Sequence, residues 1–586
     1  MWRRHWRHTR RPEPVSTKEF APDRPISFTS EGEMPPMAVS LGTTLANKTG
    51  SWRYLRPIYE EKKPPCNHAC PAGNDIRGFI ALILKGKLRE ARDLLLETNP
   101  FPGITGRVCH HPCELECNRR EFDEPLSIRA LERLVGDEGY KSLQPPQRRH
   151  KERIAIVGSG PAGLSCAYFL ARKGYHVRIF EAEREPGGML RWGIPEYRLP
   201  KAILERELSL VEGLGVELQT GVRVGRDIRL EGFDSDYDAI FLAVGATKGV
   251  ELDLPGLGAE AEAGGGVEGV LHGLEFLKRI NFGEEVKLGE RVAVIGGGNT
   301  AMDAARVALR LGAKPVVVYR RTRAEMPAIP EEVEAALEEG IEFAFLSAPV
   351  EILMADGRLK GAKFTRMELG PPDESGRRRP VPIPGSEFEL ELDSLILAVG
   401  EEPDLFFLPQ GVELREGRVN DPILVEALKL KAPVFAGGDA ATGAGTVVDA
   451  IASGRRGAEA IDRCLRGLPE PVKLEEPVLV PFERINLDYF EPRARVQGRT
   501  LTVPERIADF KEVELGLTAE EGRLEAERCF SCGACNQCDN CITYCPDVAI
   551  SRHGDRYEVD YDYCKGCGIC AEECPRWVIS LVEEGK

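Results

Sequence analysis

The sequence predicts an α/β protein in which two βαβ units, one inserted into the domain of the other, lie between two cysteine-rich segments. A glycine-rich turn that joins a strand to a helix occurs twice in the middle of the chain. All of the 17 cysteines except Cys166 and Cys464 fall in two clusters, one before and one after these units. With 586 residues the chain is too long for a single hydrophobic core, so we expect several domains.

The first βαβ unit is the run RIAIVGSGPAGLSCAYFLARKGYHVRIFE at 153–181. Its strand at 153–157 enters a GxGxxG turn, a helix follows, and a second strand ends in an acid. The glycines permit a tight turn and close approach to a pyrophosphate, the helix N-terminus offers N–H groups to phosphate, and the acid accepts hydrogen bonds from a ribose. We predict a Rossmann-like dinucleotide site at Gly158, Gly160, Ala162, Gly163 and Glu181.

Further residues of this domain, which we place at 150–285 and 395–470, are expected to complete the site. The run GGMLRWGIPEYRLP at 187–200 begins with a glycine pair that permits close approach to a flat ring. A later strand, within 434–440, ends in an acid that can reach a polyol chain. The additional candidates are Gly188, Met189, Leu190, Arg198, Gly245, Gly438, Asp439 and Thr446.

The second βαβ unit, at 286–394, repeats this plan. Its strand at 291–295 enters GGGNTA, then come a helix and a strand at 315–319. Arg320 and Arg321, with Arg323 close behind, stand where the first unit has its acid, and arginine suits a ribose 2′-phosphate. We therefore expect FAD in the first domain and NADP(H), with NAD(H) as the alternative, in the second; the arginines can also be read as a solvated surface cluster. The candidates are Gly296, Gly298, Asn299, Thr300, Ala301, Arg320 and Arg321.

The C-terminal domain, at 526–586, carries two full bacterial ferredoxin runs of the form Cys-x2-Cys-x2-Cys-x3-Cys-Pro. In this motif the fourth cysteine ligates the other [4Fe–4S] cluster. We therefore pair one set as Cys535, Cys538, Cys541 and Cys574, and the other as Cys564, Cys567, Cys570 and Cys545. Cys529 and Cys532 are left over and allow a slipped assignment, but the run that contains Cys541 alone has the correct x3-Cys-Pro sequel.

The N-terminal cysteines lie in a predicted helical domain at 61–149, in the spacing Cys66-x3-Cys70 and Cys109-x3-Cys113-x3-Cys117. Helices are predicted at 76–98 and from about Ser127. Cysteines in loops between helices suit an iron–sulfur cluster, and zinc is the competing interpretation. His68, His110 and His111 would join a zinc site, but we interpret each as a local hydrogen-bonding residue.

The remaining segments are a Pro- and Ser-rich stretch at 1–60, read as a linker or as an extended arm that wraps another subunit, and a linker at 471–525. We interpret Cys166 and Cys464 as packed thiols. A net charge of −16 argues against a nucleic-acid partner, and no apolar run is long enough to span a membrane. The basic start, residues 1–11, has no apolar region after it, which predicts no secretory signal and a cytoplasmic location; a transit peptide is the alternative.

These parts together predict an iron–sulfur flavoprotein. A nicotinamide gives two electrons as hydride, clusters usually accept one electron at a time, and a flavin converts between the two. The chemistry is that of the cofactors, and we assign no catalytic side chain. The direction of electron flow is left open.

The motifs resemble those of the small subunit of NADPH-dependent glutamate synthase and related flavoproteins, over about residues 60–470. The matching runs are CNHACPAG at 66–73, GRVC-x3-C-x3-C at 106–117, GSGPAGL, GGMLRWGIPEYRLP, GGGNTAMD, YRRTRAEMPA at 319–328 and GGDAATG-x-GTVVDAI at 437–451. The resemblance implies glutathione-reductase-like paired domains with FAD at the first site, NAD(P)H at the second, and an N-terminal cluster domain.

The chain departs from that family in two ways. The family pattern has two more cysteines shortly before the first pair, whereas this chain has none before Cys66. The resemblance therefore implies one N-terminal [4Fe–4S] cluster, with two as the alternative, held by Cys70, Cys109 and Cys113 and, by family position, Glu132. Cys66 and Cys117 stay unassigned, or one of them replaces Glu132.

The second departure is the tail, which is similar to the ferredoxin subunit of 2-oxoacid:ferredoxin oxidoreductases; a similar layout occurs in the flavoprotein that serves dissimilatory sulfite reductase. The chain has no thiamine-diphosphate motif and no siroheme-type cysteine set. We expect an NAD(P)H:acceptor oxidoreductase subunit, in a hetero-oligomer or homodimer, that exchanges electrons with a larger enzyme such as an oxoacid oxidoreductase, a sulfite reductase or glutamate synthase. The alternatives are a free-standing NADPH:ferredoxin oxidoreductase and a scaffold subunit with an empty site.

Overall fold

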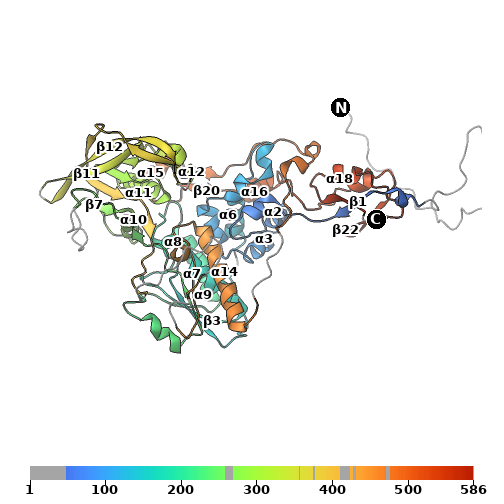
Figure 1. Ribbon diagram of the computed structural model, residues 1–586, viewed down its shortest axis with the longest axis horizontal. Helices are drawn as coiled ribbons and strands as arrows, with labels where there is room; N and C mark the ends of the chain where they lie inside the picture. Colours follow the sequence, from blue (N-terminus) through green and yellow to red (C-terminus); the bar gives the residue numbers. More distant parts are fainter. Residues whose placement is uncertain are drawn as a thin grey trace, which may run out of the picture. The chain divides into compact units, whose positions relative to one another are not determined.

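The structure is a computed structural model that describes residues 48–140, 142–257, 268–355, 357–373, 376–408, 423–425, 430–469 and 476–584 (Figure 1). The described residues form two compact units. The larger unit contains residues 63–482 and 491–531, and the smaller contains 48–62, 483–490 and 532–584. In these described ranges, no helix combines the length and the apolar character needed to cross a membrane.

The first nucleotide domain of the larger unit is built on a sheet with strand order β17-β18-β5-β2-β3-β4, parallel except for β17. The strands are β2 (Arg153–Val157), β3 (His176–Phe180), β4 (Glu217–Gln219), β5 (Ala239–Leu242), β17 (Ile423–Leu424) and β18 (Val434–Ala436). The helices are α7 (Pro161–Lys173), α8 (Met189–Trp192), α9 (Lys201–Gly213), α13 (Asp439–Thr442) and α14 (Val447–Arg466), with a 3₁₀ helix at Leu230–Ser235.

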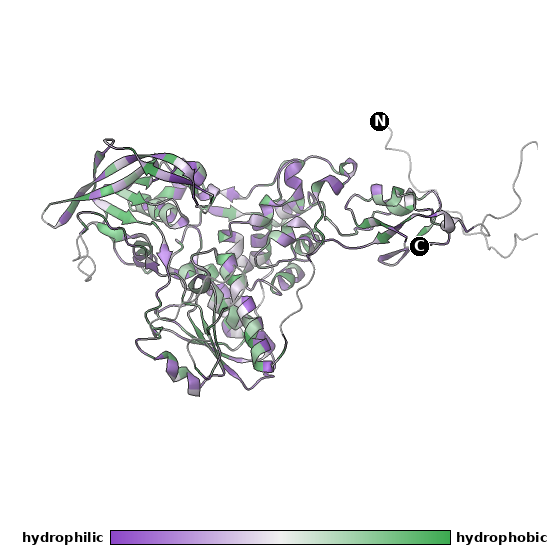
Figure 2. Ribbon diagram, in the orientation of Figure 1, coloured by the Kyte–Doolittle hydropathy of each residue, from purple (hydrophilic) through white to green (hydrophobic). Residues whose placement is uncertain are grey.

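Helices α7 and α14 lie side by side and share one core with strand β2 (Figure 1). Hydrophobic and hydrophilic residues recur along α14 in the manner of an amphipathic helix, which has one apolar and one polar face (Figure 2). Its buried stripe includes Val448, Ile451 and Ile461. Cys166 lies fully buried in this core as expected, but Cys464 is exposed on α14, so the prediction that both thiols are packed is wrong for Cys464.

The second nucleotide domain has a wholly parallel sheet with strand order β10-β9-β8-β15-β7. Its strands are β7 (Val270–His272), β8 (Arg291–Ile295), β9 (Lys314–Tyr319), β10 (Glu342–Phe345) and β15 (Ser394–Leu397), and its helices are α10 (Gly273–Asn281), α11 (Asn299–Arg310) and α12 (Pro330–Glu338), with a 3₁₀ turn at Arg323–Glu325. An antiparallel sheet packs on the parallel one through residues such as Val318 and Phe364. It consists of β11 (Ser347–Ala355), β12 (Arg358–Pro372), β13 (Arg378–Pro382) and β14 (Phe388–Glu391).

The boundaries predicted for the insertion, near 285 and 395, need correction. Strands β7 and β15 both belong to the second sheet, although the sequence analysis placed them in the first domain. The chain crosses between the domains at β6 (Lys248–Gly249) and β16 (Glu401–Glu402), which pair antiparallel. The error has a physical cause, because buried parallel strands are short apolar runs that carry no mark of the sheet to which they belong.

The N-terminal domain of the larger unit is helical, as predicted. It contains α1 (Pro65–Ala69), α2 (Ile76–Leu84), α3 (Leu88–Leu95), α4 (Pro102–Val108), α5 (Pro112–Leu115), α6 (Ile128–Glu138) and a 3₁₀ helix at Asn118–Glu121. The predicted helix at 76–98 is split in two because the chain turns at Gly86, which has a φ of +70°.

The stretch 471–525 was expected to be a linker, but most of it is folded; its residues 471–475 lie outside the described ranges. It forms β19 (Arg499–Thr500), α15 (Val503–Ala508), β20 (Glu514–Gly516) and α16 (Ala519–Ala526). Helix α16 contacts α2 and α6, and Leu517 and Ala526 are part of the core of the helical domain. Residues 517–526 are therefore part of the N-terminal domain, whereas residues 483–490 belong to the smaller unit.

The smaller unit contains the tail. It has two short helices, α17 (Asn540–Thr543) and α18 (Ile569–Glu572), the hairpin β21 (Ile550–His553) and β22 (Arg556–Val559), and strand β23 (Ile579–Glu583). Strand β1 (Leu55–Tyr59) pairs antiparallel with β23, and Arg53 forms an ion pair with Glu584. Residues 1–47 of the predicted arm lie outside the described ranges, whereas residues 55–59 are a strand of the tail unit. The short run LRPIY, half-buried at a sheet edge, gave no clear strand signal in the sequence.

Candidate functional site

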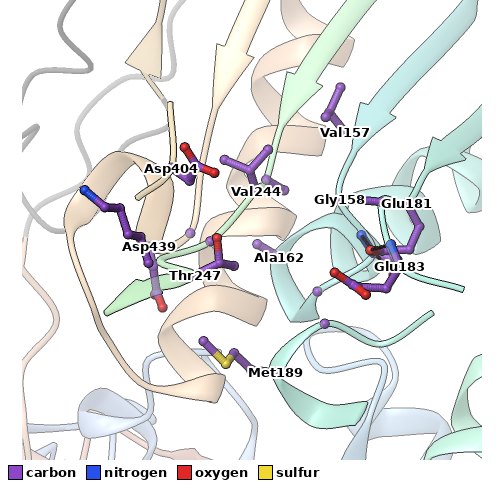
Figure 3. Close-up of a pocket in the computed structure, with 18 of the residues that line it drawn as sticks. Val157, Gly158, Ala162, Glu181, Glu183, Met189, Val244, Thr247, Asp404 and Asp439 are labelled. Atoms are coloured by element: carbon purple, nitrogen blue, oxygen red, sulfur yellow. Dashed lines mark hydrogen bonds between the residues drawn. The ribbon is translucent and has the colours of Figure 1, made fainter. Parts of the chain in front are cut away.

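A pocket of about 550 Å³ opens at the carboxyl ends of β2, β3, β5 and β18 (Figure 3). In parallel α/β sheets this is the edge where nucleotides bind, and the volume is typical of a cofactor site. The predicted residues that line it are Gly158, Gly160, Ala162, Glu181, Gly188, Met189, Gly245, Gly438, Asp439 and Thr446.

Three predicted residues are not in the lining. A Cβ atom on Gly163 would lie 2.0 Å from the carbonyl oxygen of Gly158, so this glycine serves helix packing. Leu190 is fully buried in the core. Arg198 is buried and paired with Asp303 at 2.7 Å and with Glu332 at 2.8 Å, which joins the first domain to helices α11 and α12 of the second.

The glycine turn leaves a space of the kind a pyrophosphate needs. Gly158 has a φ of +102°, and a Cβ atom there would lie 2.4 Å from the carbonyl oxygen of Ala243. In front of Gly160, by contrast, a Cβ atom would meet no atom within 4 Å. Gly160 caps helix α7, whose first N–H groups therefore face this open space. The cradle fits FAD.

One end of the pocket is defined by Glu181, which lies with Glu183 beside Gly158 in Figure 3. The backbone N–H of Ser159 donates to Oε2 of Glu181 at 2.9 Å, and its hydroxyl donates to the same oxygen. The N–H of Gly187 donates to the Ser159 hydroxyl at 3.0 Å. Ser159 thus ties the acid to both glycine runs; it was not among the predicted residues, although its place inside the GxGxxG turn was an available signal.

The other end is defined by Asp439, which lies near Thr247 and Met189 in Figure 3. Burial raises the pKa of the Asp439 carboxyl to about 6, although the N–H of Gly445 donates to it at 3.2 Å. An acceptor in this position can bind the hydroxyls of a polyol chain, as expected from the sequence.

The second glycine turn has the same construction as the first. A Cβ atom on Gly296 would lie 2.0 Å from the carbonyl oxygen of Ala398, whereas the space at Gly298 is open. Ala301 is fully buried where the first turn has Gly163. Asn299 accepts a hydrogen bond from the N–H of Ile329 at 2.9 Å, and Thr300 donates to Glu401 at 2.8 Å. The open space at the N-terminus of α11 fits a dinucleotide phosphate.

The structure separates the two predicted arginines. Arg320 is exposed at the end of β9. Arg321 is buried, pairs with Asp373 at 2.7 Å and donates to the carbonyl oxygen of Arg378 at 2.7 Å. Arg320 is thus accessible to solvent, while Arg321 ties the end of β9 to the antiparallel sheet.

The tail cysteines gather in the two predicted sets. Cys535, Cys538, Cys541 and Cys574 line one small pocket, and Cys545, Cys564, Cys567 and Cys570 line another. Strand β1 contributes Tyr59 to the first pocket and Pro57 to the second. The Tyr59 ring stacks on Tyr557 with centroids 5.7 Å apart. Sequence reasoning missed both residues because they lie in the segment interpreted as an arm.

Of the N-terminal candidates, Cys70 packs with Cys113 in one hydrophobic cluster and with Cys109 in another, and Glu132 is buried on α6 of the same domain. Burial raises the pKa of Cys70 to about 11 and that of Glu132 to about 7. Asn99 and Thr105 donate to Oε1 of Glu132 at 2.8 and 2.5 Å. Buried thiols with an adjacent carboxylate fit an iron–sulfur cluster.

Across the described ranges, no group of three or more His, Cys, Asp or Glu side chains is arranged to hold a single metal ion, and this includes the tail sets. Ligands that surround a multi-atom cluster stand farther apart than ligands on one zinc ion. His111 fits the interpretation made from sequence, because its ring contacts Glu331 at 3.2 Å and the carbonyl oxygen of Cys109 at 3.1 Å.

Comparison with known families decides the identity of this fold. Residues 152–454 match the family described as pyridine nucleotide-disulphide oxidoreductase. The chain belongs to this family. Residues 58–143 match the dihydropyrimidine dehydrogenase domain II, 4Fe-4S cluster family, and residues 557–576 match a 4Fe-4S binding domain. The predicted cofactors, FAD, NAD(P)H and [4Fe–4S] clusters in both end segments, are thereby confirmed, as is an NAD(P)H oxidoreductase activity.

Three relatives extend the comparison. The NADP⁺-dependent formate dehydrogenase subunit beta of Moorella thermoacetica is 41% identical over 505 residues, which cover 80% of this chain and 70% of that protein. The NADPH-Fe(3+) oxidoreductase subunit beta of Geobacter sulfurreducens is 38% identical, covering 80% and 75%. The glutamate synthase [NADPH] small chain of Halomonas elongata is 38% identical, covering 68% and 87%, which confirms the resemblance seen in the sequence.

Replacement of Gly160 by alanine should remove the flavin without unfolding the protein. The φ of −68° suits alanine and the space at its Cβ is open, so the added methyl group blocks only the approach of a pyrophosphate. We expect flavin affinity to fall about tenfold or more, as overpacking predicts. Gly298→Ala is the matched control: it should retain flavin but lose reduction of the flavin by NADPH. Full flavin content in Gly160→Ala would show that this glycine does not face the cofactor.

The affinity of the apoprotein for FAD should depend on the ionisation of Asp439. Its raised pKa means that the carboxyl binds a proton below about pH 6, and a protonated carboxyl is a poorer acceptor for ligand hydroxyls. We expect affinity to fall up to about tenfold between pH 7 and pH 5, measured by flavin fluorescence quenching. Asp439→Asn should abolish this dependence, whereas Asp404→Asn, also in the lining, should retain it. An unchanged pH profile in Asp439→Asn would contradict the contact.

Proposed function

We propose that this chain is the nicotinamide-reactive subunit of a larger redox enzyme, in which it exchanges hydride with NADPH and single electrons with a partner. The observation that carries the proposal is the presence, in one chain, of a nucleotide pocket between Glu181 and Asp439 and of two tail cysteine sets with thiols at the surface. Cys535, Cys538 and Cys567 are exposed. A cluster held there would be accessible to a partner protein.

The residues of the chain bind, orient and shield, whereas bound FAD supplies the conversion between a hydride and single electrons. Oxidation of one NADPH yields NADP⁺, one proton and two electrons, which leave through the clusters one at a time. Gly158, Gly160 and the N-terminus of α7 would hold the pyrophosphate, and Glu181 and Asp439 would fix the two sugar portions. Cys70, Cys109, Cys113 and Glu132 would hold the N-terminal cluster.

The preference for NADPH rests on Arg320. An exposed guanidinium at the end of the second strand of this βαβ unit is placed to pair with a ribose 2′-phosphate. The names of the three relatives agree, since each specifies NADP or NADPH. Arg321 supports this site indirectly through its pair with Asp373.

The substrate chemistry lies on a partner. Two of the relatives are named as beta subunits, of a formate dehydrogenase and of an Fe(3+) oxidoreductase, and the third as a small chain. We therefore place this chain in a hetero-oligomer. A cytoplasmic location is consistent with its cysteines, none of which forms a disulfide.

Arg320→Ala should raise the KM for NADPH about 10- to 100-fold and leave the KM for NADH unchanged, because a charge-assisted hydrogen bond to the 2′-phosphate is lost. Flavin bleaching in a stopped-flow experiment measures the KM values for both nucleotides. Arg321→Ala is the matched control: it breaks a buried ion pair, so it should lower the melting temperature and affect both nucleotides equally. Equal losses for the two nucleotides in Arg320→Ala would refute the assignment.

Cys567→Ser should separate hydride transfer from electron exit. Because Cys567 belongs to a tail set, we expect reduction of the flavin by NADPH to continue at the wild-type rate. Transfer to a bacterial 2[4Fe–4S] ferredoxin, used as the one-electron acceptor, should fall at least about tenfold. Cys464→Ser, an exposed thiol outside every set, serves as the control. Loss of flavin reduction in Cys567→Ser would mean that the tail is no separate relay.

A further inference from the structure

Strand β1 contributes to the pockets of both tail cysteine sets, and it brings a different side chain to each. The first tail set is Cys535, Cys538, Cys541 and Cys574, and the second is Cys545, Cys564, Cys567 and Cys570. Tyr59 lines the pocket of the first set, and Pro57 lines that of the second. The two residues lie on one face of β1, because side chains two positions apart on a strand share a face. All of these residues belong to the smaller unit.

The hydroxyl of Tyr59 is a buried donor that, among the described residues, has no hydrogen-bond partner. The ring is nevertheless held in place, because it stacks on Tyr557 and packs with Cys541 and Cys574 in the core of the tail. Burial raises the pKa of Tyr59, and the Cys541 thiol raises it further, so the hydroxyl keeps its proton. A buried donor that lacks an acceptor is costly, so we expect the acceptor to belong to the bound cofactor.

Two neighbouring tyrosines differ from Tyr59 because each has an oxygen acceptor. The hydroxyl of Tyr557 donates to Oδ1 of Asp539 at 2.7 Å. The hydroxyl of Tyr561 donates to the carbonyl oxygen of Pro57 at 2.7 Å. Each of these protons is therefore already used within the protein. The Tyr59 hydroxyl instead belongs to a side chain that lines a pocket together with four thiols.

The two sets share a backbone donor at equivalent positions. The N–H of Ala549 donates to Sγ of Cys545 at 3.3 Å, and the N–H of Val578 donates to Sγ of Cys574 at 3.4 Å. Each donor lies four residues after its cysteine, in the same part of the two Cys-Pro runs. The side chains from β1 break this equivalence, because the phenol offers an O–H to the first set whereas the proline offers no polar hydrogen to the second.

We propose that the Tyr59 hydroxyl donates a hydrogen bond to a sulfur atom of the [4Fe–4S] cluster in the first tail set and thereby raises the reduction potential of that cluster alone. Reduction adds one electron to a cluster, and a donor at its sulfur stabilises the more negative state. No proton is gained or lost by the tyrosine. Tyr59 thus sets the step in potential between the two tail clusters, which decides which of them holds the electron that a partner receives. The proposal depends on the tail clusters and not on the identity of the partner.

Tyr59→Phe tests the proposal in the full-length protein with its cofactors, because it removes the hydroxyl and keeps the ring that stacks on Tyr557. A hydrogen bond to a charged group changes an equilibrium about tenfold. In a potentiometric titration followed by electron paramagnetic resonance, the potential of one tail cluster should therefore fall by about 59 mV, the value of a tenfold change for one electron. The potentials of the other clusters should not change.

Tyr557→Phe and Tyr561→Phe are matched controls. Each removes a phenol oxygen from the same unit, but one that donates to oxygen and not to sulfur. Both variants should keep the wild-type potentials of the two tail clusters. A fall in Tyr557→Phe as large as that in Tyr59→Phe would show that the effect comes from general polarity, and the proposal would be wrong.

Replacement of Tyr59 by 3-fluorotyrosine separates hydrogen bonding from packing. The ring and the hydroxyl stay, and fluorine makes the phenol more acidic and so a stronger donor. The same potential should therefore rise, whereas loss of the hydroxyl lowers it. The shift in Tyr59→Phe should persist in a Cys567→Ser background, which alters only the second set, and disappear with Cys538→Ser. Unchanged potentials in both Tyr59 variants, or a shift that belongs to the second set, would overturn the proposal.

Discussion

The carbonyl oxygen of Gly158 leaves no room for a side chain at Gly163, and this contact presses helix α7 against strand β2. Equally close packing occurs between helices α7 and α14. A Cβ atom on Gly454 would lie 2.1 Å from the carbonyl oxygen of Ala162, so α14 can dock on α7 only because that position has no side chain. The docking carries Gly438 and Asp439 to the pocket that Gly158 and Glu181 begin. A flavin site whose halves lie almost 300 residues apart in the chain therefore depends on two backbone-to-backbone contacts.

Close contact of this kind fixes the first domain internally, whereas the two nucleotide domains are linked by buried charges and by Tyr197, which packs in the core of the second domain. In the described residues, the chain crosses between them at the short pair β6 and β16. Arg198, however, is buried between Asp303 and Glu332 of the inserted domain. A rotation of one domain about the crossing strands would separate these charges within a low-dielectric interior, which is costly. The buried arginine therefore favours a fixed arrangement of the two nucleotide domains.

The sequence was sufficient for features that depend on local pattern. The strand at 153–157, the strand at 291–295 and both tail cysteine sets follow from glycine spacing, apolar runs and cysteine spacing. It failed where the deciding partner is distant. No local sequence pattern shows that β7 and β15 share a sheet, that Tyr59 lines the pocket of a cysteine set, or that Arg321 forms an ion pair with Asp373. The matched families confirm the fold and the cofactors, while the individual site residues rest on the geometry described here.

The core of the helical N-terminal domain includes residues from far along the chain. The helical N-terminal domain takes Leu517 and Ala526 into its core and holds Arg528 between Asp123 and Glu525. Its core therefore cannot close until the residues near 530 have been synthesised. The residues just before the tail thus complete the N-terminal domain. In an electron-transfer protein this has a consequence, because the helical domain with its thiols is completed only after both nucleotide domains have been synthesised.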